Sequence, residues 1–337
     1  MVDLNRRATV TDVARNAGVS KSTVSLAFSA PQRVGEVTRT RILEAAEAVG
    51  YTPDPLAQSL KTGRRNLIGL ILPDLTNPHG GAVLERVQAS ANQAGYMVMT
   101  ATASHDPARD LEFVDGFRKL KLEGIVLMPS GTDETYVQAL ASSGVLFVTY
   151  GQQLAALDCD HVGLKNDHAT LILTRHLISR GHRRIGHVAG DQRTWSGRER
   201  LKGVRAALAE SGLALAPKDL VFGDYDARKS EAAACALLAQ PDRPTALVTA
   251  NNVTAIGVLR AIRHLGLRCP EDVALATVDE LPLDDLLSPT VTCAVQPIHD
   301  MAQRAASWLI ERLENTEATH AAQFAEFPVT LRIGGST

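Results

Sequence analysis

Hydrophobic and polar positions change their spacing once along the chain. Within residues 9–50, apolar residues recur at helical spacing in three short stretches, each with its own start or stop signal. From residue 66 onward, short runs of β-branched and aliphatic residues alternate with amphipathic helical stretches. This pattern predicts a small all-helical N-terminal domain followed by a larger α/β region with parallel strands.

The N-terminal stretches carry recognisable helix signals. Thr9 is placed to cap the first helix, and Gly18 has the position of the glycine that ends it. Ser20 is placed to cap a second helix, and a third is expected at about 38–49. The short connection containing Gly18 predicts a helix-turn-helix.

The second helix of this motif has a polar exposed face. Lys21, Ser22 and Ser25 fall at its start, on the side away from the apolar positions, where such helices read base edges in the major groove. Residues 1–65 hold ten Lys and Arg against six Asp and Glu, a net charge of +4, which leaves −6 for the remainder. A basic head on an acidic body is typical of a DNA-binding module joined to another soluble domain.

Two blocks of sequence resemble the lactose-repressor (LacI/GalR) family, and the resemblance extends over the whole chain. They are VTDVARNAGVSKSTVS at 10–25 and GYTPDPLAQSLKTG at 50–63, where a short helix begun by proline is expected. The resemblance implies a homodimer in which hinge helices fold on the operator and paired leucines, here Leu60, open the minor groove. Leu26 stands where many members have arginine, so the family's usual guanine contact is not transferred. The candidate DNA-binding residues are Thr9, Lys21, Ser22, Thr23, Ser25, Leu60 and Lys61.

The α/β region consists of two similar halves. Expected strands include 66–72, 96–101, 124–128 and 145–148 in the first half, and 184–189, 220–222, 246–249 and 273–277 in the second. A helix at 298–315 and a strand at 327–331 would return to the first half, as in periplasmic-binding-protein-like cores. The predicted organisation is a DNA-binding domain (1–50), a hinge and linker (51–65) and an effector-binding and dimerisation core (66–337), with lobe one at about 66–165 and 297–331 and lobe two at about 166–296.

Polar residues that match the family's cleft positions follow the predicted strands. The resemblance implies that this cleft binds a small molecule, and Asp, Asn and Arg side chains suit the hydroxyl groups of metabolites such as sugars. Either Tyr225 or Trp195 is expected to supply an apolar face of the pocket. The candidate effector-binding residues are Asp74, Asn77, Arg200, Tyr225, Asn251, Asp279 and Gln296.

Purely structural roles are open for several of these residues. Asn77 precedes a proline and could simply begin a helix, while Asn251 and Asp279 could cap helices. Arg200 could pair with a carboxylate. His79, Gly80 and Gly81 replace bulky aromatic residues often found after Asn-Pro in the family, which suggests a roomier or more polar pocket.

Other functional classes fit the sequence less well. It lacks GxGxxG, GxxxxGK[ST], GxSxG and HExxH motifs, its four cysteines have no paired spacing, and no apolar run is long enough to span a membrane. We therefore expect no enzyme activity, catalytic site, metal or cofactor. A free-standing sugar receptor is disfavoured by the basic head and by an N-terminus without a signal peptide, which indicates a cytoplasmic protein. The absence of a leucine heptad favours a dimer over a tetramer, and either effector logic, inducer or corepressor, remains open.

Overall fold

A computed structural model of the 337-residue chain describes residues 8–29, 31–51, 65–315 and 321–337. The chain divides into two compact units, Met1–Asn66 and Leu67–Thr337. The expected hinge helix, with Leu60 and Lys61, lies outside the described residues. None of the helices in the described ranges is long and apolar enough to cross a membrane.

Within residues 8–29 and 31–51, the first unit is a bundle of three short helices, as the sequence predicts. The backbone N–H and the hydroxyl of Thr9 both donate to the Asp12 carboxylate, at 2.9 and 2.6 Å. Gly18 has a φ of 62°, the left-handed conformation that ends the first helix. The Ser20 hydroxyl accepts from the Thr23 N–H and thereby caps the second. The helices are α1 (Val10–Ala17), α2 (Lys21–Ser29) and α3 (Glu36–Ala48), with a 3-10 turn, η1 (Pro31–Arg33), between the last two.

The second unit is built from two sheets, which define its two lobes. The sheet of lobe one has the order β11-β5-β4-β3-β1-β2, and all its pairings are parallel. Its strands are β1 (Leu67–Leu72), β2 (Met97–Thr102), β3 (Ile125–Leu127), β4 (Phe147–Tyr150), β5 (Asp160–Leu164) and β11 (Phe324–Phe327). Its helices are α5 (Pro78–Gln93), α6 (Pro107–Lys119), α7 (Glu134–Ser142) and α12 (Ile298–Glu314).

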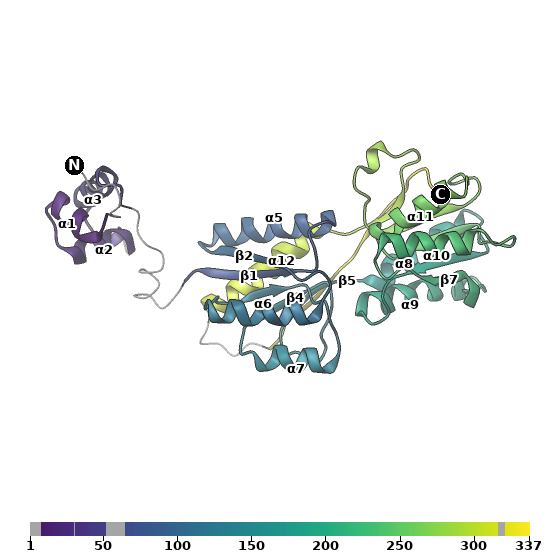
Figure 1. Cartoon of the computed structure of the whole chain (residues 1–337), viewed down its shortest axis with the longest axis horizontal. Helices are drawn as coiled ribbons and strands as arrows, with labels where there is room; N and C mark the ends of the chain where they lie inside the picture. The colour runs from purple at the N-terminus through teal and green to yellow at the C-terminus, as the bar shows by residue number, and fades with distance from the viewer. Residues whose placement is uncertain (1–7, 30, 52–64, 316–320) are drawn as a thin grey trace. The chain divides into compact units, whose positions relative to one another are not determined.

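Helices cover both faces of the lobe-one sheet, with α5 and α12 on one face and α6 and α7 on the other (Figure 1). Ile68 and Leu70 of β1 pack in the cluster that contains residues of α5 and α12, whereas Ile71 packs with Phe117 of α6. Gly69 lies beneath Phe117, where an added Cβ would be 2.6 Å from the ring. Burial on both faces explains why β1 reads as a continuous apolar run.

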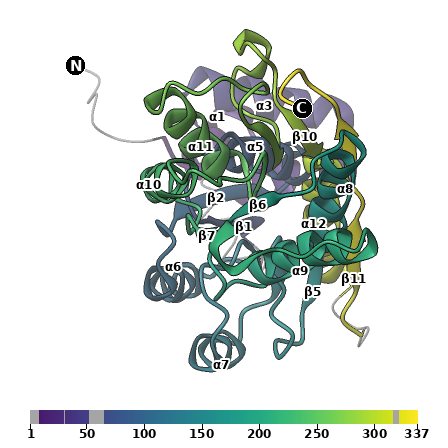
Figure 2. The same cartoon turned by 90° about the vertical axis from the view of Figure 1, so that its right-hand side faces the viewer.

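The lobe-two sheet has the order β12-β10-β9-β8-β6-β7, and only its edge pairing, β10 with β12, is antiparallel. Helices α8 and α9 pack together, as do α10 and α11, on opposite sides of the sheet (Figure 2). The strands are β6 (Ile185–Ala189), β7 (Leu220–Phe222), β8 (Ala246–Thr249), β9 (Ala274–Val278), β10 (Thr292–Val295) and β12 (Thr330–Arg332). The helices are α8 (Asn166–Ser179), α9 (Trp195–Glu210), α10 (Ala227–Leu238) and α11 (Asn252–His264), with 3-10 turns η2 (Pro217–Asp219) and η3 (Asp284–Leu286).

The last part of the chain corrects one expectation. The sequence predicts a single strand at 327–331 in lobe one, but the structure has two strands that overlap this range, β11 (Phe324–Phe327) and β12 (Thr330–Arg332). β11 joins the lobe-one sheet beside β5, and β12 joins the lobe-two sheet beside β10. The chain thus leaves lobe one after β5, returns with α12, and passes back to lobe two between β11 and β12. Residues 330 and 331 belong to lobe two rather than to the expected lobe-one segment 297–331.

Candidate functional site: a polar pocket between the lobes

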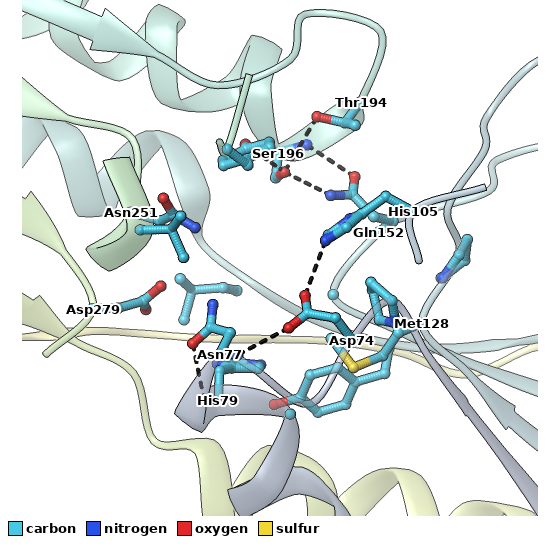
Figure 3. Close-up of a pocket in the computed structure, with 18 of the residues that line it drawn as sticks. Asp74, Asn77, His79, His105, Met128, Gln152, Thr194, Ser196, Asn251 and Asp279 are labelled. Atoms are coloured by element: carbon cyan, nitrogen blue, oxygen red, sulfur yellow. Dashed lines mark hydrogen bonds and ion pairs between the residues drawn. The ribbon is translucent and has the colours of Figure 1, made fainter. Parts of the chain in front are cut away.

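One pocket, of about 180 Å³, lies between the carboxyl ends of the strands of both lobes. Ligands of open parallel sheets bind at such edges, because the loops that follow the strands converge there. All seven of the candidate effector-binding residues predicted from the sequence line this pocket, several of them visible in Figure 3. They are Asp74, Asn77, Arg200, Tyr225, Asn251, Asp279 and Gln296.

The loop after β1 places two of these residues. One oxygen of the Asp74 carboxylate accepts from the backbone N–H groups of Thr76 and Asn77, at 2.7 and 2.9 Å. The other is 2.9 Å from His105 Nε2, as the dashed line in Figure 3 marks. The hydrogen bond to His105 is the main reason that the pKa of Asp74 falls well below its usual range. Asp74 is therefore ionised at neutral pH.

Arg200, on α9, is buried with a fixed orientation. Its Nε donates to the Asn166 side chain at 2.7 Å and its Nη1 to the Ala250 carbonyl at 2.5 Å. Its guanidinium carbon lies 6.0 Å from the centre of the Tyr225 ring. The carboxylate partner considered from the sequence is thus replaced by an amide oxygen and a backbone carbonyl.

The loops after β8 to β10 supply the lobe-two wall. Asn251 is the N-cap of α11, and its side chain accepts from the N–H and the hydroxyl of Thr254. The capping role weighed for Asn251 is therefore present, although the residue also lines the pocket. Asp279 precedes no helix; its carboxylate accepts from the Gln296 side chain. The φ of 70° at Asp279 is an unusual backbone conformation of the kind that often occurs at functional sites.

Tyr225 lies in the loop after β7 with a φ of 59°. A positive φ is uncommon for so bulky a residue. Its hydroxyl bonds to Ser196 at 2.9 Å, and the Ser196 hydroxyl in turn accepts from the Gln152 side chain at 2.6 Å. Trp195, the alternative apolar wall, is not among the lining residues and lies edge-on to His161 instead.

Direct hydrogen bonds join the two lobes beside the pocket. The side chains of Asn77 and Asn252 donate to each other's amide oxygens at 3.3 and 3.1 Å. The Gln152 amide both donates to the Ser196 hydroxyl and accepts from its backbone N–H. Asn77, Gln152 and Ser196 also line the pocket, so these contacts between the lobes lie at the site itself.

Sequence reasoning missed further lining residues. Ser130 lies three residues beyond β3 and Gln152 two residues beyond β4, so the rule that selected the other residues would also have selected these two. Asn166 follows β5, a strand that the sequence pattern did not predict. Tyr150, within β4, carries no such signal in the sequence. The remaining unpredicted lining residues include His79, His105, Met128, Leu164, Thr194 and Ser196.

The head presents the predicted polar face on α2. Lys21 and Ser22 are exposed, and Ser25 is partly exposed, while Val24 and Ala27 are buried on the opposite side. The Ser22 and Thr23 hydroxyls both lie 2.7 Å from the Ser20 hydroxyl. Thr9 is exposed, with its hydroxyl bonded to Asp12. The surface offered to a partner is therefore rich in hydroxyl groups and has one lysine.

Comparisons with known proteins agree with this arrangement. The sequence model for bacterial regulatory proteins of the lacI family matches residues 9–54. The model for the periplasmic binding protein-like domain matches residues 174–337. The two matches thus cover the helix-turn-helix and the greater part of lobe two together with α12, β11 and β12.

Relatives with both parts are transcriptional repressors rather than enzymes. The repressor PurR of Photobacterium profundum is 28% identical over 311 residues, covering 91% of this chain and 92% of that protein. The ribose operon repressor of Haemophilus influenzae is 28% identical over 325 residues, covering 96% and 98%. The solved complex of the transcriptional regulator CelR with cellobiose is 26% identical, with a TM-score of 0.73 and coverage of 98% and 100%. The chain belongs to the lacI family of bacterial regulatory proteins and is a DNA-binding transcriptional repressor of that family.

Proposed function

We propose that a small hydroxylated metabolite, such as a sugar or a sugar derivative, binds between the lobes and releases this repressor from a near-palindromic operator. The observation that carries the proposal is the convergence of seven polar residues on one pocket, six from loops that follow strands and Arg200 from helix α9. The carboxylates accept from ligand hydroxyls, the amides donate and accept, and Arg200 offers its remaining N–H groups. The cellobiose complex of CelR supports a sugar as the class of ligand.

Ligand binding acts on DNA through the angle between the lobes. A ligand that replaces the Asn77–Asn252 or Gln152–Ser196 contacts changes which lobe arrangement is favoured. We propose that this change separates the hinge segments of the two subunits and lowers DNA affinity. Coupling energies between two such sites are typically about 1–3 kcal/mol, or roughly 5–150-fold in affinity.

The operator is bound by a homodimer in this proposal. Two-fold symmetry of the protein matches the two-fold symmetry of a near-palindromic site, with one head in each half-site. Two exposed leucines at η3 support a second copy as partner: Leu283, its N-cap, and Leu286, its last residue, are 69% and 74% exposed.

DNA contacts are assigned to Thr9, Lys21, Ser22, Thr23 and Ser25 in the head, and to Leu60 and Lys61 in the hinge. Leu60→Ala tests the assignment most sharply, because a wedge in the minor groove acts only at a bendable operator. The variant should lose much more affinity for operator DNA than for random-sequence DNA. An equal loss on both DNAs would contradict the wedge role.

Lys61→Ala, next to Leu60 in the hinge, is the variant with which Leu60→Ala is compared. If Lys61 contacts a phosphate, its removal weakens binding to all sequences and reduces the dependence of log affinity on log salt by about 1. Fluorescence anisotropy at several salt concentrations measures both quantities. A salt dependence equal to that of the unmodified protein would remove Lys61 from the contact set.

A further inference from the structure

The Tyr150 hydroxyl is buried at the pocket without a partner. Tyr150 is 1% exposed, lines the pocket, and among the described residues no group hydrogen bonds to its hydroxyl. Two other tyrosines of this unit differ in this respect: the hydroxyl of Tyr136 donates to Asp110 at 2.8 Å, and that of Tyr225 bonds to Ser196. Buried polar groups are nearly always satisfied, so an exception facing a binding pocket indicates a partner brought by the ligand.

The surroundings keep this hydroxyl protonated. Burial, and secondarily the negative charge of Asp279, raise the pKa of Tyr150 far above its ordinary value. The His79 ring packs edge-on to Tyr150, with ring centres 5.8 Å apart. Burial lowers the pKa of His79, which favours its neutral form. This part of the pocket therefore presents an O–H donor and an uncharged imidazole.

The charged groups of the pocket wall disfavour a negatively charged ligand. Two carboxylates, Asp74 and Asp279, face the pocket with one guanidinium, Arg200. Arg200 already directs two of its N–H groups to Asn166 and Ala250. A phosphate or carboxylate in this space would therefore meet two carboxylates, Asp279 and the His105-bonded Asp74, with one partly engaged guanidinium to offset their charge.

We infer that the pocket takes an uncharged polyhydroxylated ligand, and that the Tyr150 hydroxyl donates a hydrogen bond to one of its oxygen atoms. This inference rests on the proposed effector function and narrows it in two ways. Neutral sugars are bound in preference to sugar phosphates and sugar acids. Tyr150 is a specificity-determining residue, which selects a ligand with an acceptor oxygen near His79.

The first test needs no ligand and compares two substitutions in the full chain. Tyr150→Phe removes a buried hydroxyl that has no protein partner, so the melting temperature should stay the same or rise. Tyr136→Phe deprives the buried Asp110 of a donor, so the melting temperature should fall. If Tyr150→Phe lowers the melting temperature as much as Tyr136→Phe does, the hydroxyl is part of the protein's own network and the inference fails.

The second test uses matched pairs of probes with the full chain. D-ribose, D-glucose and cellobiose are compared with D-ribose 5-phosphate, D-glucose 6-phosphate and D-gluconate by thermal unfolding, and binders are titrated by calorimetry. At least one neutral sugar should raise the melting temperature, while the charged compounds should not. Tyr150→Phe should weaken its binding about tenfold, as expected for loss of one hydrogen bond, and Tyr136→Phe should not.

The possible results of the second test distinguish a failure of this inference from a failure of the proposed function. If a phosphorylated or acidic probe binds more tightly than every neutral one and releases operator DNA, the effector function holds and the uncharged ligand is wrong. If a neutral sugar binds equally well to Tyr150→Phe, the role of Tyr150 is wrong. If none of the neutral sugars binds, the inference is rejected. Binding of the operator by the head does not depend on this result and is measured separately.

Discussion

Two buried histidines link single side chains to the stability of the core. His187 of β6 is fully buried, with Nδ1 2.8 Å from the Val248 carbonyl, and His161 of β5 is 4% exposed beside Phe324. Burial lowers the pKa of each to about 4. In the unfolded chain a histidine has a pKa of about 6.5, so between these values the unfolded state binds more protons.

The free energy of unfolding should therefore fall as the pH decreases from about 6.5 to 4, by roughly 3 kcal/mol for each histidine. His187→Gln and His161→Gln remove the titrating group and should flatten this dependence, as measured by urea unfolding of the full chain at pH 7, 6 and 5. His264→Gln, at an exposed site, is the control and should retain the wild-type slope. An unchanged slope in both core variants would mean that these histidines are protonated in the folded protein.

The sequence alone did not decide whether some residues have a structural role, a role in the pocket, or both. Asn251 caps α11 and also lines the pocket, so the two interpretations offered by the sequence are compatible. Tyr150 was missed because an aromatic residue within a buried strand is ordinarily part of the core. Its difference from other core residues is an unpartnered hydroxyl, which depends on tertiary neighbours.

At the scale of elements, the close crossing of α8 and α9 depends on a glycine. Gly203 of α9 faces α8, and an added Cβ would be 2.0 Å from the Asp167 carbonyl oxygen and 2.3 Å from the Thr170 hydroxyl. The first of these contacts is to backbone, which cannot rotate away. The packing of α8 on α9 matters for function because α9 carries Arg200 into the pocket.

Gly203→Ala should destabilise the protein by about 1–3 kcal/mol, the usual cost of overpacking. Gly116→Ala is the matched control, because Gly116 is also inside a helix, α6, but a Cβ there would meet nothing within 4 Å. This control should leave stability unchanged or raise it by up to about 1 kcal/mol. Circular dichroism melts compare the two; a similar fall in both variants would contradict the crossing argument.

Most elements of the fold were predictable from the sequence, and the missed ones have common causes. The strands β1 and β8 consist mainly of apolar residues, and the sequence pattern predicts their bounds within one residue. β5 was missed because its buried residues include Asp160 and His161, which are held by Arg312 and Thr149. The division between β11 and β12 was missed because lobe membership is set by long-range pairing, which leaves no local pattern.

At the scale of the whole molecule, the proposed dimer can be tested at the loop that carries Leu283 and Leu286. The loop is held in place by Asp284, which accepts from Arg332 at 2.5 Å and from the Val291 N–H at 3.0 Å. Its exposed leucines therefore occupy fixed positions, as an interface requires.

Leu283→Asp with Leu286→Asp should convert the dimer to a monomer and weaken operator binding, because one head contacts only half of the site. Sedimentation velocity measures the first effect and anisotropy the second. Leu120→Asp, at an exposed leucine that follows α6, is the control and should remain dimeric. A double variant that stays dimeric would place the interface elsewhere.

The central claim is that ligand binding between the lobes controls DNA binding by the head. The most direct test measures the affinity of the full chain for an operator selected from genomic DNA, with and without a ligand found by thermal unfolding. Unmodified protein should show a change of roughly 5–150-fold. The Asp279→Ala variant should bind the same operator. Its affinity for the operator should not change at the ligand concentration that shifts the affinity of the unmodified protein. If ligand shifts the affinity of Asp279→Ala as much as that of the unmodified protein, or shifts neither, the pocket is not the controlling site.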